Sequence, residues 1–138
     1  MGVAFSPTIP QVLGYAEVTS SQGSITTIVD LTSLTTTVTV PSGGRRVKIT
    51  GWGSFTENDA ERTLTMYIYE DSTALQEANG FVRSGTNTSP VALVPIVVLT
   101  PSAGAHTYKL RALSNGSGGT LSASSNRHCT LVVPLCWA

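Results

Sequence analysis

Charged side chains are scarce in this chain of 138 residues: Asp, Glu, Lys and Arg make up 12% of it, about half of the share that is usual in globular domains. Eight Lys and Arg balance eight Asp and Glu, so the formal net charge is zero. Because nucleic-acid binding needs a basic surplus to neutralise phosphates, we expect no nucleic-acid partner. A net charge near zero also gives little protection against association, which favours a fixed oligomer.

Long apolar runs are lacking as well. No segment approaches the roughly 20 apolar residues that cross a bilayer, and we expect no membrane partner. Residues 1–10 lack the basic start and the continuous apolar stretch of a secretion signal. We therefore expect synthesis in a cytoplasm.

Cysteine and histidine occur only twice each, as Cys129, Cys136, His106 and His128. A zinc site needs closely spaced pairs of such residues, whereas the adjacent His128 and Cys129 would point to opposite faces of a strand. Cys129 alternates with Leu131 and Val133, which is typical of a small core residue. We expect free thiols, no bound metal, no cofactor and no catalytic residue; a nucleophilic pair of Cys129 and His106 is the alternative that the sequence leaves open.

Acidic residues cluster at two turns, around Glu57, Asp59 and Glu61 and again at Glu70 and Asp71. Acids at turns usually face solvent or bond the backbone, and neither cluster has the pattern of a calcium loop. The glycine-rich segment 115–119 lacks the lysine and the following helix of a phosphate loop. We interpret its glycines as a source of flexibility in a hairpin.

The sequence is instead rich in short Val, Thr and Ile runs, interrupted by Gly, Pro, Asn and Asp, and about a quarter of its residues are Ser or Thr. This pattern predicts one all-β domain, an antiparallel β-sandwich or barrel. Only 74–80 has a helix-favouring composition, but seven residues are too few for an isolated helix, and we assign it to a strand. The ten candidate strands are 12–19, 25–31, 35–40, 45–56, 62–70, 74–83, 91–100, 105–113, 120–125 and 128–134.

Two of these strands carry a second face that is unlike a simple charged solvent face. In 63–70 the aliphatic face of Leu64, Met66 and Ile68 belongs in the core, and the other face carries Thr and Tyr, residue types common at protein interfaces. In 91–99 both faces are apolar, so a neighbouring subunit, or a loop or arm of the same chain, must cover the second one. Pro95 belongs at an edge or a bulge, and Trp52 is either surface cover or an interface anchor. The candidate subunit-interface residues are Trp52, Tyr67, Tyr69, Val94, Ile96 and Val98.

Residues 1–11 are predicted to form an extended arm ahead of a domain at 12–138, because prolines interrupt a short apolar stretch. The arm is either a frayed terminus or a segment that docks on a neighbour. The doublet Arg45 and Arg46 either protects a sheet edge or forms salt bridges with a partner. The candidate attachment residues are Val3, Phe5, Pro7, Ile9, Arg45 and Arg46.

Five motifs resemble those of small virion proteins of tailed bacteriophages, notably phages of actinobacteria. They are LGYA at 13–16, ITTIVDL at 25–31, VTVPSGGRRVKITG at 38–51, LTPSAGAHTYKL at 99–110 and GGTLSAS at 118–124. Such proteins are similar to the trimeric jelly rolls of the tumour necrosis factor and complement type. The resemblance implies an all-β, antiparallel jelly roll of about 8–10 strands that forms a homotrimer.

The same resemblance implies a function in the virion, after synthesis in the host cytoplasm. We expect a non-enzymatic capsid decoration protein that binds the phage major capsid protein, since only about eleven residues precede the first strand, whereas tail versions carry a long attachment region. One alternative is a knob of a minor tail protein or tail fibre, with tail proteins as partners. The other is a carbohydrate-binding module in which Trp52, Tyr67 and Tyr69 stack on a host glycan.

Overall fold

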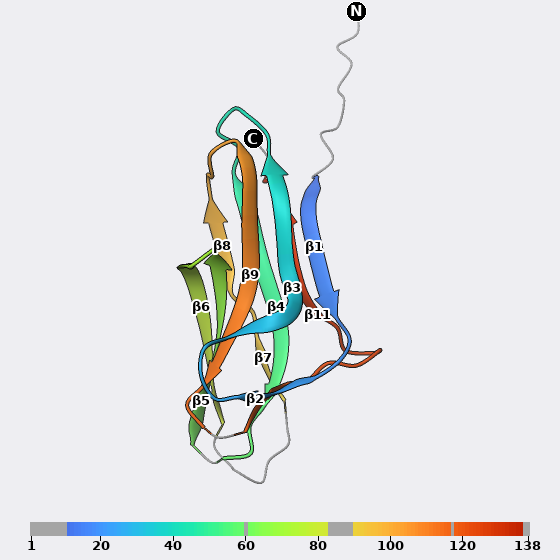
Figure 1. Cartoon of the computed structure of the whole chain (residues 1–138), viewed down its shortest axis with the longest axis vertical. Coiled ribbons are helices and arrows are strands. Elements are labelled where there is room, and N and C mark those ends of the chain that lie inside the picture. The colour runs from blue at the N-terminus through green and yellow to red at the C-terminus, as the bar shows by residue number, and fades with distance from the viewer. Residues whose placement is uncertain (1–10, 60, 83–89, 117, 137–138) are drawn as a thin grey trace, which may run out of the picture.

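The structure is a computed structural model that describes residues 11–59, 61–82, 90–116 and 118–136. Figure 1 shows these residues as an elongated all-β body, and no helix that could cross a membrane occurs among them. The strands are β1 (Val12–Val18), β2 (Gln22–Ile25), β3 (Val29–Val40), β4 (Val47–Thr56), β5 (Arg62–Glu70), β6 (Thr73–Val82), β7 (Val91–Leu93), β8 (Ile96–Leu99), β9 (Gly104–Ser114), β10 (Gly119–Leu121) and β11 (Cys129–Pro134).

The strands form two antiparallel sheets that pack as a sandwich. A seven-stranded sheet has the order β1-β11-β4-β10-β2, with β7 and β8 paired to β4, and a four-stranded sheet has the order β3-β9-β5-β6. The first long strand pairs with the last, β3 with β9, β4 with β7 and β8, and β5 with β6. Strands near the two ends of the sequence pair with each other, and so do successively inner strands, which is the pattern of one long hairpin folded over into two sheets. This strand order confirms the all-β jelly roll.

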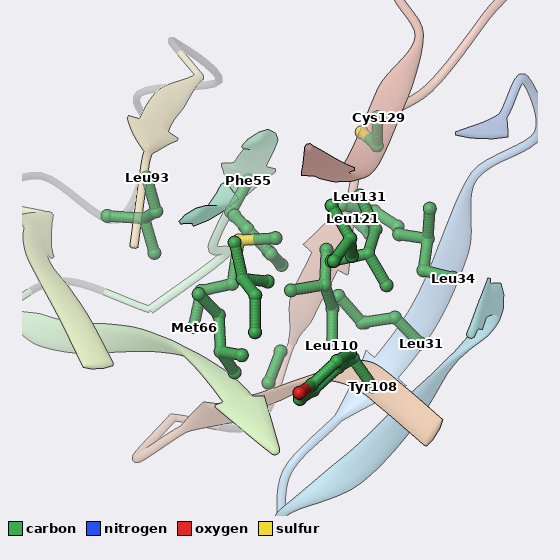
Figure 2. Close-up of a cluster of buried hydrophobic side chains, with 14 of the residues drawn as sticks. Leu31, Leu34, Phe55, Met66, Leu93, Tyr108, Leu110, Leu121, Cys129 and Leu131 are labelled. Atoms are coloured by element: carbon green, nitrogen blue, oxygen red, sulfur yellow. The ribbon is translucent and has the colours of Figure 1, made fainter. Parts of the chain in front are cut away.

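The core lies between the two sheets and is mostly aliphatic, with Tyr108 and Phe55 as its largest fully buried side chains. Leu64, Met66 and Ile68 of β5 are at most 1% exposed, which confirms the face predicted from the alternation of that strand. Cys129 is also fully buried, on the same side of β11 as Leu131. Figure 2 shows how side chains from both sheets meet in this cluster.

Several predicted strand boundaries were wrong. The segment 25–31 is not one strand, because Ile25 ends β2 and Val29 already begins β3. The strand predicted at 35–40 is the second half of β3, which continues through an irregularity between Asp30 and Thr35. Ser33 lies there with a φ of 66°, a conformation that local propensity does not reveal.

The other corrections concern strand ends and one interruption. The predicted strand 91–100 divides into β7 and β8 at Pro95, whose carbonyl accepts a hydrogen bond from Gly51 N at 3.0 Å. The break agrees with the expectation that this proline lies at an edge or a bulge. The strand expected from residue 45 begins at Val47, and the one expected at 120–125 is only Gly119–Leu121. The segment 74–80 lies within β6, as predicted.

Trp52 lies between two glycines whose side of β4 faces the opposite sheet. A Cβ added at Gly51 would lie 2.7 Å from Leu110 Cδ2, and one added at Gly53 would lie 2.8 Å from Phe55 Cε2. Both neighbours are fully buried. The glycines therefore let the central strand approach the core closely, while Trp52 points to the outside.

Candidate interaction surfaces

The outer face of the sheet β1-β11-β4-β8 carries an unusual number of apolar side chains, and we call it the apolar face. Strand registers place its side chains in cross-strand rows. One row is Tyr15, Val132, Thr50 and Ile96. A second is Glu17, Thr130 and Trp52, and a third includes Val12 with Pro134 and Lys48 with Val98. Val94, in the break between β7 and β8, lies on the same side, because Ala92 and Ile96 flank it two residues away.

Large apolar side chains on this face are open to solvent. The exposed fractions are 54% for Val12, 52% for Tyr15, 43% for Val94, 45% for Ile96 and 42% for Val98. Exposed apolar residues scattered singly need no explanation, but a contiguous patch marks an interaction site. The second face of 91–99, predicted to need cover from elsewhere, is thus left uncovered by the described residues of this chain.

A polar chain of hydrogen bonds borders the apolar face at one corner. Tyr15 donates its hydroxyl to Glu17 Oε2 at 2.9 Å, and His128 Nδ1 lies 2.8 Å from the same oxygen. The second ring nitrogen, Nε2, lies 2.9 Å from the Ser125 carbonyl. Two acceptors around one imidazole favour its doubly protonated form, so the Glu17 carboxylate and then the Ser125 carbonyl raise the pKa of His128. The hydrogen bond from Tyr15, followed by that from His128, lowers the pKa of Glu17.

His106 is held in the same manner at the other end of the sandwich. Its Nδ1 bonds the Glu70 carboxylate and its Nε2 lies 2.8 Å from the Ser102 carbonyl. The hydrogen bond to Glu70 raises the pKa of His106, against an opposing effect of partial burial.

These two histidines predict a pH dependence of stability. A folded-state pKa raised above the unfolded value of about 6.5 gives a stabilising contribution that is complete below that value. The contribution disappears as the pH rises through the folded-state pKa. We expect the melting temperature to fall over this range and the fall to shrink in the His106→Gln, His128→Gln double variant. Proton NMR titration of the imidazoles measures both pKa values directly, and values at or below 6.5 would contradict the prediction.

The outer face of the four-stranded sheet is polar and its side chains bond one another. Asp30 of β3 accepts ion pairs from Lys109 Nζ at 3.1 Å and from Arg111 Nε at 2.7 Å. The Arg111 guanidinium also lies 4.8 Å from the ring centroid of Tyr69, a cation-π distance. Tyr67 and Tyr69 meet edge to face, with 5.9 Å between centroids. The groups on this face are therefore largely satisfied within the chain.

The structure does not bring the six candidate interface residues into one patch. Trp52, Val94, Ile96 and Val98 lie on the apolar face, whereas Tyr67 and Tyr69 of β5 lie on the opposite side of the molecule. Tyr69 is only 9% exposed, because it packs beneath Arg111. The three aromatic residues proposed to stack on a glycan thus share no common surface. Sequence reasoning missed Val12, Tyr15 and Val132, which only the registers of β1 and β11 place on the same face as Ile96.

Cys129 and His106 do not form a nucleophilic pair. Cys129 pairs with Val18 at the far end of β1, whereas His106 pairs with Val38 near the end of β3 that leads into β4. The Cys129 thiol lies 3.8 Å from the Ser122 carbonyl, and burial raises its pKa, which disfavours the reactive thiolate. Both cysteines are free, as expected, although Cys136 is only partly buried. Among the residues that the structure describes, no group of three His, Cys, Asp or Glu could hold a metal ion.

Glu57 was expected to face solvent or to bond the backbone, and the structure shows the second of these, with a side chain that is only 2% exposed. Its carboxylate accepts hydrogen bonds from the backbone N of Asn58 at 2.8 Å and of Gly118 at 2.9 Å, and from the Ser114 hydroxyl. A Cβ at Gly116 would lie 2.7 Å from Glu57 Oε2. This glycine therefore permits close approach to a buried carboxylate, which corrects its interpretation as a source of flexibility.

The attachment candidates Val3, Phe5, Pro7 and Ile9 lie outside the described residues. Arg45 and Arg46 lie in the connection between β3 and β4, just before Val47. Arg45 is partly buried and Arg46 exposed.

Comparisons with known proteins add little to this geometry. No protein-family model matches the sequence, and no curated protein matches it. Among solved structures, the chain is similar to a chain of "Structure of infectious bursal disease virus Gx strain", with 15% identity and a TM-score of 0.49. The alignment covers 100% of this chain and 42% of that one, so the chain spans less than half of its length. A match at this level carries no argument about function, and the fold rests on the strand pairing.

Proposed function

We propose that this chain is a non-enzymatic structural protein of a bacteriophage virion, a homotrimer that decorates the outer shell of the capsid. The motifs at 13–16, 25–31, 38–51, 99–110 and 118–124 support the virion assignment through their resemblance to small phage proteins. The jelly-roll strand order agrees with the fold that this resemblance implies.

The observation that carries the proposal is the apolar face. About half of the surface of Ile96, Val98 and Tyr15 on this face is exposed to solvent. No described residue of the chain packs over these side chains. A second and third copy can cover the face if the sandwiches stand side by side around a threefold axis. Closed rotational symmetry then limits the assembly to one size, which keeps a chain of zero net charge from aggregating without limit.

Assembly in solution is the first consequence. Light scattering after size-exclusion chromatography should give about 43 kDa, three chains of 14.4 kDa each, over a wide concentration range. Apolar burial of this kind supplies the dominant free energy of association, so the mass should change little with salt. A mass of one chain at every concentration would contradict the proposal.

Location on the particle is the second consequence. Immunogold electron microscopy of particles purified from the producing host should label the shell, and mass spectrometry should find the protein in those particles. Gold restricted to the tail would favour the tail-knob alternative over decoration. Absence of the protein from purified particles would contradict a virion function of either kind.

A further inference from the structure

One end of the sandwich gathers segments that are far apart in the sequence. β1 and β4 begin there and β3, β8 and β11 end there (Figure 1). Leu135 N donates to the Gln11 carbonyl at 2.8 Å, and Cys136 N donates to the Arg46 carbonyl at 2.8 Å. These bonds fix the start of β4 to both ends of the described chain. The backbone that carries Arg45 and Arg46 is therefore part of a rigid joint.

On the segments that meet in this joint the charged residues are all positive, while Glu70, which bonds His106, lies towards the same end on the four-stranded sheet. Arg45, Arg46 and Lys48 fall within four positions, and the neighbouring segments 11–14, 41–44, 100–104 and 134–136 contain no Asp or Glu. We call this region the basic end. Its three cations form no ion pair with any described residue, whereas Lys109 and Arg111 share Asp30 and Arg62 lies 3.7 Å from Asp59.

Arg45 provides a second, independent observation. Its Nε atom is buried and has no hydrogen-bond partner in the described part of the chain. Buried donors are nearly always satisfied in folded proteins, so the acceptor for Arg45 Nε is expected from beyond the described residues. A carboxylate fits best, because the planar guanidinium binds it through two parallel, charge-assisted hydrogen bonds.

We propose that the basic end docks on an acidic protein surface, whose carboxylates pair with Arg45 and Arg46, while Lys48, in the row of Val98, lies at the border between the basic end and the apolar face. The inference rests on the proposed function, in which that surface belongs to the capsid shell, and it assigns the end of the molecule that faces the shell. Nucleic acid is disfavoured, because three cations on a chain of zero net charge neutralise too few phosphates.

The test uses the full chain and poly-L-glutamate as the probe, with binding followed by two-dimensional NMR of the ¹⁵N-labelled protein. Arg45→Ala with Arg46→Ala should weaken binding by about tenfold or more, because two charge-assisted contacts are lost. Arg127→Ala removes an exposed cation at the opposite end and should change binding by less than about twofold. Amide resonances of residues 45–48 should shift and those around Arg127 should not.

Lysine chemistry gives a second readout, since Lys48 and Lys109 are the only lysines. A carbodiimide joins an amine to a carboxylate with loss of water, which converts the reagent to its urea. Cross-links to poly-L-glutamate should map to Lys48, because Lys109 is already paired with Asp30. Equal weakening by Arg127→Ala, cross-links only at Lys109, or tighter binding of a DNA duplex than of poly-L-glutamate would each overturn the proposal.

The oligomeric state separates this inference from the proposed function. The Arg45→Ala, Arg46→Ala variant should keep the mass of the unmodified protein in light scattering, because neither residue belongs to the apolar face. A monomeric unmodified protein that still binds poly-L-glutamate through the basic end would refute the trimer and leave the docking site standing. A trimer that fails to bind the probe would refute the docking site alone.

Discussion

Replacing Ile96 by Asp should convert the assembled protein into folded monomers of 14.4 kDa. Ile96 lies on β8 of the apolar face, between Val94 and Val98 along the strand, and ends the row that includes Tyr15, Val132 and Thr50. A carboxylate buried there without a partner costs about 3–5 kcal/mol, which weakens association by more than about a hundredfold. The side chain is 45% exposed in the single chain, so the fold itself should tolerate the change. Sedimentation velocity measures the mass, and far-ultraviolet circular dichroism verifies the fold.

Phe81→Asp is the matched control for this prediction. Phe81 is the most exposed large apolar side chain described, at 55%, but it pairs with Thr63 on the outer face of the four-stranded sheet. This variant should sediment as the unmodified protein does. Dissociation by Phe81→Asp without dissociation by Ile96→Asp would move the subunit contact to the opposite face.

Removing the Glu57 carboxylate should produce the largest loss of stability among single substitutions of acidic residues. Glu57→Ala leaves the backbone N–H groups of Asn58 and Gly118 and the Ser114 hydroxyl without their acceptor. Each unsatisfied buried group costs roughly 1–3 kcal/mol, and such losses are not fully additive. We expect a decrease of about 3–5 kcal/mol in the free energy of unfolding. Urea denaturation followed by tryptophan fluorescence gives this quantity.

Two further variants separate the carboxylate from its loop. Glu57→Gln keeps one carbonyl acceptor and should lose less, about 1–3 kcal/mol. Glu61→Gln alters an exposed acid in the same connection and should stay within about 0.5 kcal/mol of the unmodified protein. Equal losses in the free energy of unfolding for Glu57→Ala and Glu61→Gln would show that the buried hydrogen bonds of Glu57 do not stabilise the fold.

Alternation within single strands could be predicted from the sequence because it depends on neighbouring residues alone. The burial of Leu64, Met66 and Ile68 and the exposure of Val94, Ile96 and Val98 both follow from the period of two in a pleated strand. The interruption of the strand at Pro95 could be predicted for a similarly local reason, because proline has no backbone N–H to donate to a neighbouring strand. The all-β class followed from the frequency of turn residues.

Long-range register lay beyond sequence reasoning. The hydrogen bonds of Glu57 reach residues 57 and 61 positions away, and no local signal distinguishes this acid from Glu61. The sheet to which a strand belongs decides whether two exposed faces coincide. Tyr67 and Trp52 are both aromatic residues on strands, but their strands belong to different sheets, so the two side chains lie on opposite sides of the molecule. Tyr15 could be assigned to the apolar face only once the register of β1 was known.

Hydroxyl-radical footprinting of the assembled protein tests most directly whether the apolar face is the contact between copies. Oxidation of Tyr15 and Trp52, read by mass spectrometry, should be several times lower in the unmodified protein than in the Ile96→Asp monomer, because contact with another copy excludes solvent from both rings. Oxidation of Phe81, on the other sheet, should be the same in both proteins. Equal oxidation of Tyr15 and Trp52 in the assembly and in the monomer would contradict the account.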